Sequence, residues 1–121
     1  MILFGLALAG AGGALMRYQV ELHVRRRLGS SLPFGTLIIN VSGSFALGLL
    51  VGLAERHGVR AGVVTVLGTG LLGAFTTFST FSYDTVGLVE RGRSGTAWAN
   101  VAASLVFGLG AAALGLAVGH L

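Results

Sequence analysis

Four long apolar stretches constrain this chain more than any other feature. They cover residues 1–22, 33–54, 62–89 and 95–119, and each provides the ~20 residues that a helix needs to cross a bilayer. Only 10% of the residues are charged, and most of these lie between the stretches. The connections are too short for a soluble domain. The sequence therefore predicts an all-α membrane protein, in which residues 1–121 form a single domain of four transmembrane helices.

The basic residues are all arginine and lie mainly near the ends of the apolar stretches. In so apolar a chain they indicate topology and headgroup anchors, so we expect neither a nucleic-acid partner nor a required protein partner. By loop, one side has Arg17, Arg25–Arg27, Arg91 and Arg93, and the other has Arg56 and Arg60. This moderate bias places both termini outside. No basic segment precedes the short apolar run at the N-terminus, so we expect the first stretch to remain in the mature protein.

Small residues recur every four positions in three of the predicted helices. The series are Gly5, Ala9 and Gly13; Ser44, Gly48 and Gly52; and Gly108–Ala112 with Gly115–Gly119. Lipid gives helices no hydrophobic reason to associate, so close approach of their backbones through small residues has to hold a bundle together. These series predict the helix contacts.

Polar side chains also share helix faces. Thr36 and Asn40 align in the second stretch, and Asn100 and Ser104 align in the fourth, because residues four apart lie on one side of a helix. A buried amide must find hydrogen-bond partners, so Asn40 is either a tie between helices or a functional group. Asp84 lies late in the third stretch, where it either reaches the interface, pairs with an arginine or serves the function.

The segment from Gly68 to Phe81 differs from an ordinary membrane helix because it combines glycines, phenylalanines and hydroxyls. Phe75, Phe78 and Phe81 fall on one arc, beside Thr76, Ser79 and Thr80. Such a phenylalanine series is also typical of a lipid-facing or core surface. A glycine-rich, broken helix is tolerated in a membrane only where protein or a cavity surrounds it. We therefore expect the third helix to break near its middle and to form a site.

Other functions fit the residues less well. Residues Gly68–Gly73 match the dinucleotide-binding pattern G-x-G-x-x-G, but the chain lacks the alternating strands and amphipathic helices of that fold. The histidines lie at the ends of the stretches, and no base accompanies Ser79 or Thr80, so we do not expect an enzyme. The chain contains no cysteine and so no thiolate metal site. A small proton-coupled multidrug antiporter remains the alternative, although residues 1–20 contain no acid.

Amide and hydroxyl donors, together with the positive edges of aromatic rings, suit a small anion. A cation filter would instead use acidic side chains or inward-pointing carbonyls. Anion conduction is therefore the leading interpretation of the polar faces. Four helices form a thin wall for a pore, so we expect an oligomer.

Three ordered motifs make the chain resemble the Fluc-type fluoride channels, also called CrcB proteins, over essentially its whole length. The motifs are Gly12-Gly13-x-x-x-Arg17-Tyr18, then Gly35-Thr36-x-x-x-Asn40-x-x-Gly43-Ser44-Phe45-x-x-Gly48, and then Gly70-x-x-Gly73-x-x-Thr76-Thr77-Phe78-Ser79-Thr80-Phe81-Ser82. The resemblance implies an antiparallel homodimer in the inner (plasma) membrane. Each dimer would have two pores that passively export fluoride and so relieve fluoride toxicity.

The resemblance also implies roles for single residues. Asn40 would donate to fluoride, Phe78 and Phe81 would present ring edges, Ser79, Thr80 and Ser104 would extend the polar path, and Arg17 would draw anions to a vestibule. The main-chain oxygens of Gly73 and Thr76 would hold a structural sodium ion between the subunits. Two features depart from the family: Asn100 stands where many relatives have tyrosine, and the arginine bias is unexpected in a subunit that inserts both ways.

Overall fold

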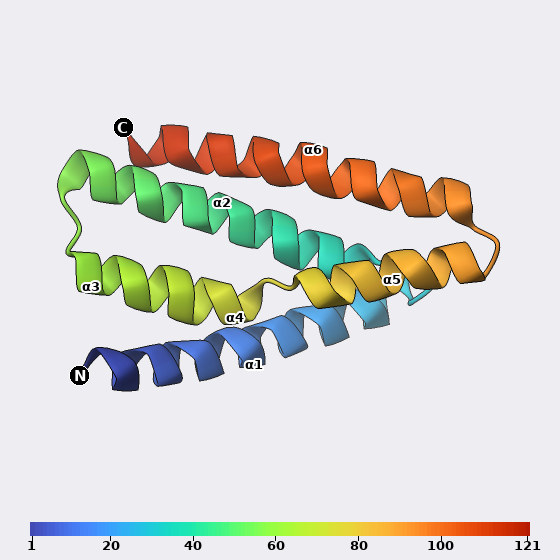
Figure 1. The fold of residues 1–121 in the computed structure, drawn as a ribbon, viewed down its shortest axis with the longest axis horizontal. Helices are drawn as coiled ribbons and strands as arrows, with labels where there is room; N and C mark the ends of the chain where they lie inside the picture. Colours follow the sequence, from blue (N-terminus) through green and yellow to red (C-terminus); the bar gives the residue numbers. More distant parts are fainter.

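A computed structural model describes residues 1–121 as helices joined by short connections. Helix α1 covers Ile2–Leu28, α2 covers Phe34–His57 and α6 covers Ser94–Gly119. Between α2 and α6 the chain forms a broken rod of α3 (Ala61–Val64), the π-helix η1 (Thr65–Leu72), α4 (Gly73–Phe75) and α5 (Phe78–Glu90). The rods run alternately up and down, so both termini lie at one end of the molecule (Figure 1).

Three segments are long and apolar enough to cross a membrane: Phe34–His57, Ala61–Glu90 and Ser94–Gly119. Their bounds agree closely with the second, third and fourth predicted stretches. Helix α1 does not meet the same hydropathy criterion, although it is 27 residues long. Most large apolar side chains lie on the outside, as expected where the surroundings are hydrocarbon. The chain is thus a multi-pass membrane protein, and its fourth span remains a prediction.

The predicted end of the first helix is wrong. We expected a charged connection from Glu21 to Arg27, but α1 continues as a helix to Leu28. Glu21 accepts a hydrogen bond from Arg25 at 3.3 Å, a four-residue spacing that supports a helix. The three arginines at Arg25–Arg27 lie in the last turn, where the helix dipole favours positive charge. Gly29 then ends the helix at a positive φ of 78°.

The small-residue series pack as predicted. Helix α2 contacts α6 most extensively, and the two run side by side in Figure 1. A Cβ added at Gly48 would collide with the carbonyl of Ala112, and one added at Gly115 would collide with that of Phe45. On the other side of the molecule, Gly13 brings α1 against the carbonyl of Leu71. These contacts hold the backbones of neighbouring helices together.

The predicted break in the third helix is confirmed, and a π-helix precedes it. The chain is extended at Thr76 (φ −80°, ψ 158°) and at Thr77 (φ −150°, ψ 121°), between α4 and α5. The π-helix was not expected from the sequence. Such segments have wider turns and often occur beside functional sites. Together they place a non-helical stretch in the interior of an apolar rod.

Candidate functional site

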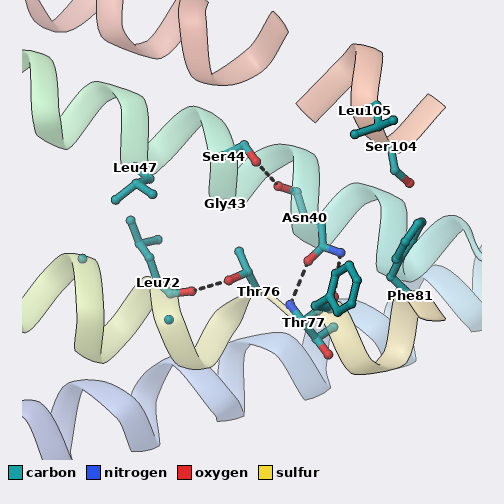
Figure 2. Close-up of a pocket in the computed structure, with 13 residues that line it drawn as sticks. Asn40, Gly43, Ser44, Leu47, Leu72, Thr76, Thr77, Phe81, Ser104 and Leu105 are labelled. Carbon is teal, nitrogen blue, oxygen red and sulfur yellow. Dashed lines mark hydrogen bonds between the residues drawn. The ribbon is translucent and has the colours of Figure 1, made fainter. Parts of the chain in front are cut away.

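Asn40 holds the break in place. Its side-chain Nδ2 donates to the carbonyl of Thr77 at 2.8 Å, and the amide of Thr77 donates to its Oδ1, also at 2.8 Å (Figure 2). Ser44 donates to the carbonyl of Asn40 at 2.8 Å one turn later. Because both polar groups of Thr77 are satisfied by one amide, the break is stable within an apolar bundle. The structure thus shows Asn40 as a tie between helices.

Thr77 is the residue that sequence reasoning missed. Its side chain is only 8% exposed, and its hydroxyl accepts from the amide of Thr80 at 3.2 Å as the N-cap of α5. Threonine is a preferred N-cap residue, so the pair Thr76-Thr77 before an apolar helix was the signal that could have revealed it. Thr77 therefore both ends the break and begins the next helix.

A cleft of about 390 Å³ lies beside the break, between α2, the broken rod and α6. Most of the predicted pathway residues meet there, although they are far apart in the sequence (Figure 2). No charged residue lines it; the lining consists of Asn40, Gly43, Ser44, Leu47, Gly68, Leu72, Gly73, Thr76, Thr77, Phe78, Phe81, Ser104 and Leu105. Ser79, Thr80 and Arg17 are not part of this lining.

Ser79 and Thr80 lie next to the cleft, in a cluster of hydroxyls around Thr77. The hydroxyl of Thr77 donates to that of Thr80 at 3.0 Å and lies 3.3 Å from that of Ser79. A hydroxyl has a single hydrogen, so Ser79 is the donor in the second contact and Thr80 keeps its own hydrogen unused. The predicted polar path thus starts as a hydrogen-bonded cluster.

Several hydrogen-bond donors around the cleft have no partner within the chain. Asn40 uses only one of its two Nδ2 hydrogens, and the hydroxyl of Ser104 makes no hydrogen bond. The hydroxyl hydrogen of Thr80 completes the set. These unpaired donors, and not fixed charges, are the chemical character of the site.

Two aromatic rings stand at the same place. The ring centroids of Phe78 and Phe81 are 5.7 Å apart, and the ring planes are tilted by 43°. Phe78 is 79% exposed in the single chain, whereas Phe81 is partly covered. The edge of a phenyl ring carries partial positive charge, so these rings add weak positive potential to the donors.

Arg17 lies half-buried on α1 and makes neither a hydrogen bond nor an ion pair with another side chain. Its vestibule role stays a prediction. The intramembrane acid Asp84 accepts from the hydroxyl of Thr36 at 2.9 Å and pairs with no arginine. Both residues of this pair lie outside the cleft.

The main-chain oxygens proposed from the sequence as ligands of sodium have lost their helical donors. In a continuous helix, the amide of Thr77 would bond to the carbonyl of Gly73, and the amide of Thr80 to that of Thr76. Here Thr77 donates to Asn40 and Thr80 donates to the Thr77 hydroxyl. Oxygen atoms freed in this way suit a hard cation, so these two positions fit a sodium ion.

Comparison with known proteins agrees with this site. The family model of the CrcB-like proteins (camphor resistance) matches residues 4–116. A protein of Allorhizobium ampelinum is 47% identical over 94% of this chain and 92% of its own length. Proteins of Shewanella loihica and Acidobacterium capsulatum are 44% and 42% identical, over 82% and 94% of this chain and 80% and 92% of their own lengths. Each of the three relatives is named "Fluoride-specific ion channel FluC". The chain therefore belongs to the CrcB-like protein family.

Proposed function

We propose that this protein is a fluoride-selective channel, and not an enzyme, that passively exports fluoride and so relieves its toxicity. The observation that carries the proposal is the uncharged cleft beside the break, in which Asn40, Ser104 and the neighbouring Thr80 offer unpaired donors. The fluoride-specific relatives support the choice of ion.

The mechanism follows from replacing water by neutral dipoles. A small anion that enters a membrane must exchange its hydration shell for donors of the protein. Asn40 would give its free N–H, Phe78 and Phe81 their ring edges, and Ser79, Thr80 and Ser104 their hydroxyls. Conduction requires binding that is weak enough for release, and a set of neutral donors meets this requirement better than an arginine would. Arg17 would serve farther out, by attracting anions to the entrance.

The protein would work as an antiparallel homodimer in the inner (plasma) membrane, with α1 as the fourth span and two pores per dimer. The exposure of Phe78 and Ser79 at the cleft supports this assembly. Hydroxyls and broken backbone are not tolerated against lipid, so a second subunit has to cover this face. One chain supplies only part of the wall that a pore requires.

A structural sodium ion would lie at the interface of the two subunits. The main-chain oxygens of Gly73 and Thr76 from both chains would hold it, since neither oxygen receives its helical hydrogen bond. The ion would supply a fixed positive charge that stabilises the broken helices and lowers the cost of an anion nearby.

Efflux from vesicles in the presence and absence of a potassium ionophore tests passive conduction against the antiporter alternative. A channel carries net charge, so fluoride efflux from potassium fluoride vesicles should be slow until the ionophore lets potassium follow. Fluoride movement that ignores the ionophore and follows an imposed proton gradient would contradict the proposal. Proton-coupled uptake of an organic cation would favour the antiporter, whose titratable cleft residue is missing here.

A further inference from the structure

A chain of hydrogen bonds connects α6 to the turn of α5 that carries Phe81. The side-chain Nδ2 of Asn100 donates to the hydroxyl of Thr85 at 3.0 Å, and that hydroxyl donates to the carbonyl of Phe81 at 2.7 Å. Asn100 is only 9% exposed and does not line the cleft that holds the proposed pathway. The hydrogen bonds therefore reach the pathway from outside it.

The direction of these bonds is fixed by chemistry. The single hydrogen of the Thr85 hydroxyl is used on Phe81, so the hydroxyl can only accept from a partner on α6. The amide of Asn100 supplies that donor. A carboxylate or an apolar side chain at position 100 would leave the hydroxyl without a donor. Position 100 thus requires a hydrogen-bond donor.

Helix α5 depends on such ties for its orientation. It has 13 residues, and polar ties fix its inner face at three levels: Asn40 with Thr77, Thr36 with Asp84, and Asn100 with Thr85. The third tie lies one turn beyond Phe81. A rotation of α5 by about 20° would move a ring about 6 Å from the helix axis by roughly 2 Å. Such a shift is large beside a dehydrated anion.

We propose that Asn100 is a positioning residue of the fluoride pathway, which sets the direction of the Phe81 ring through the hydroxyl of Thr85. This inference rests on the proposed channel function and adds a residue that touches neither the cleft nor the ion. Asn100 orients α5 in the plane where ring edge and donors meet. Its loss should therefore change which anions pass, and not only the stability of the fold.

The test compares fluoride and chloride efflux from the same vesicles for four variants. Thr85→Val removes the hydroxyl with little change in shape, Asn100→Leu removes the donor, and the double variant removes both. Thr85→Ser keeps the hydroxyl. Thr65→Val is the matched control, because the hydroxyl of Thr65 also donates four residues back, to Ala61 at 3.0 Å, away from the cleft.

We expect Thr85→Val and Asn100→Leu each to slow fluoride efflux roughly five- to tenfold, the effect of one lost hydrogen bond, and to narrow the fluoride-to-chloride ratio. The double variant should be no worse than either single one, since the two residues act as one unit. Thr85→Ser and Thr65→Val should match the wild type.

An unchanged ion ratio in Thr85→Val, or losses that multiply in the double variant, would overturn the inference while the channel function stands. If Asn100→Leu fails to fold, Thr85→Val decides the question alone. A wild-type protein that passes no fluoride would instead overturn the proposed function.

Discussion

At the scale of single residues, polar side chains combine a structural and a functional role. Asn40 spends its Oδ1 and one N–H on Thr77 and keeps one N–H for the cleft. The sequence left open whether this amide ties helices or serves the function. The geometry shows the tie, and the remaining hydrogen leaves room for the function.

Replacing Asn40 by aspartate tests this double role. The carboxylate would lose the hydrogen bond to the carbonyl of Thr77 and would place negative charge in a cleft that we propose for an anion. We expect Asn40→Asp to abolish fluoride efflux and to lower the free energy of unfolding by about 1 to 3 kcal/mol. Efflux with a fluoride electrode and thermal unfolding in detergent measure the two effects. Undiminished efflux would refute the assignment of Asn40.

Phe78 should behave differently, because it is exposed and makes no hydrogen bond through its side chain. Phe78→Ile removes the ring edge and keeps an apolar side chain, so we expect fluoride efflux to be lost while the dimer still assembles. Phe107→Ile is the control: Phe107 is also exposed, but it lies in an apolar groove between α2 and α6. Equal efflux in the two variants would contradict the role of the Phe78 ring.

The residues that sequence reasoning could place are those that recur at helical spacing. Asn40, Phe78, Phe81 and Ser104 were predicted as pathway residues, and the structure brings them to one cleft. The hydroxyl cluster around Thr77 could not be derived, because it depends on a main-chain turn that no periodic pattern describes. The pair of Thr36 with Asp84 likewise joins residues 48 positions apart.

At the scale of elements, the broken rod is the feature that shapes the site. Its glycines predicted a break, but not the π-helix of Thr65–Leu72. That segment lies where Gly13 and Gly70 let α1 approach, with Gly70 near the Cβ of Ala9. The wider turn depends on contacts with another helix, and for this reason composition does not reveal it.

The α2 and α6 pair tests whether close backbone contact holds the bundle. Gly115→Ala would push a methyl group against the carbonyl of Phe45 and within 2.8 Å of the amide of Leu49. We expect it to lower the free energy of unfolding by about 1 to 3 kcal/mol. Gly110→Ala on the same helix meets nothing within 4 Å and should be neutral or slightly stabilising. Equal stability of the two variants in detergent would contradict the packing.

At the scale of the whole molecule, the single chain is incomplete as a pore. Its cleft opens at a surface where Phe78 and Ser79 are exposed. The sequence predicted an oligomer from the thin wall of four helices, and this remains a proposal. Neither the partner nor an ion between two chains can be read from the periodicity of one chain.

Sodium removal tests the proposed assembly. The unpaired oxygens of Gly73 and Thr76 would need a cation when two chains face each other. Replacing sodium by a bulky organic cation should therefore weaken the dimer or its fluoride efflux over hours, because such an ion cannot approach main-chain oxygens. Size-exclusion chromatography and efflux follow the change. Indifference during long incubation would argue against a structural ion.

The most direct measurement of anion passage through neutral dipoles loads vesicles with equal fluoride and chloride and records both ions with selective electrodes. The cleft is uncharged, with unpaired N–H and O–H donors suited to a small, strongly hydrated anion. We expect fluoride to leave the vesicles while chloride stays inside. Release of both ions at the same rate, or of neither, would contradict the proposed pathway.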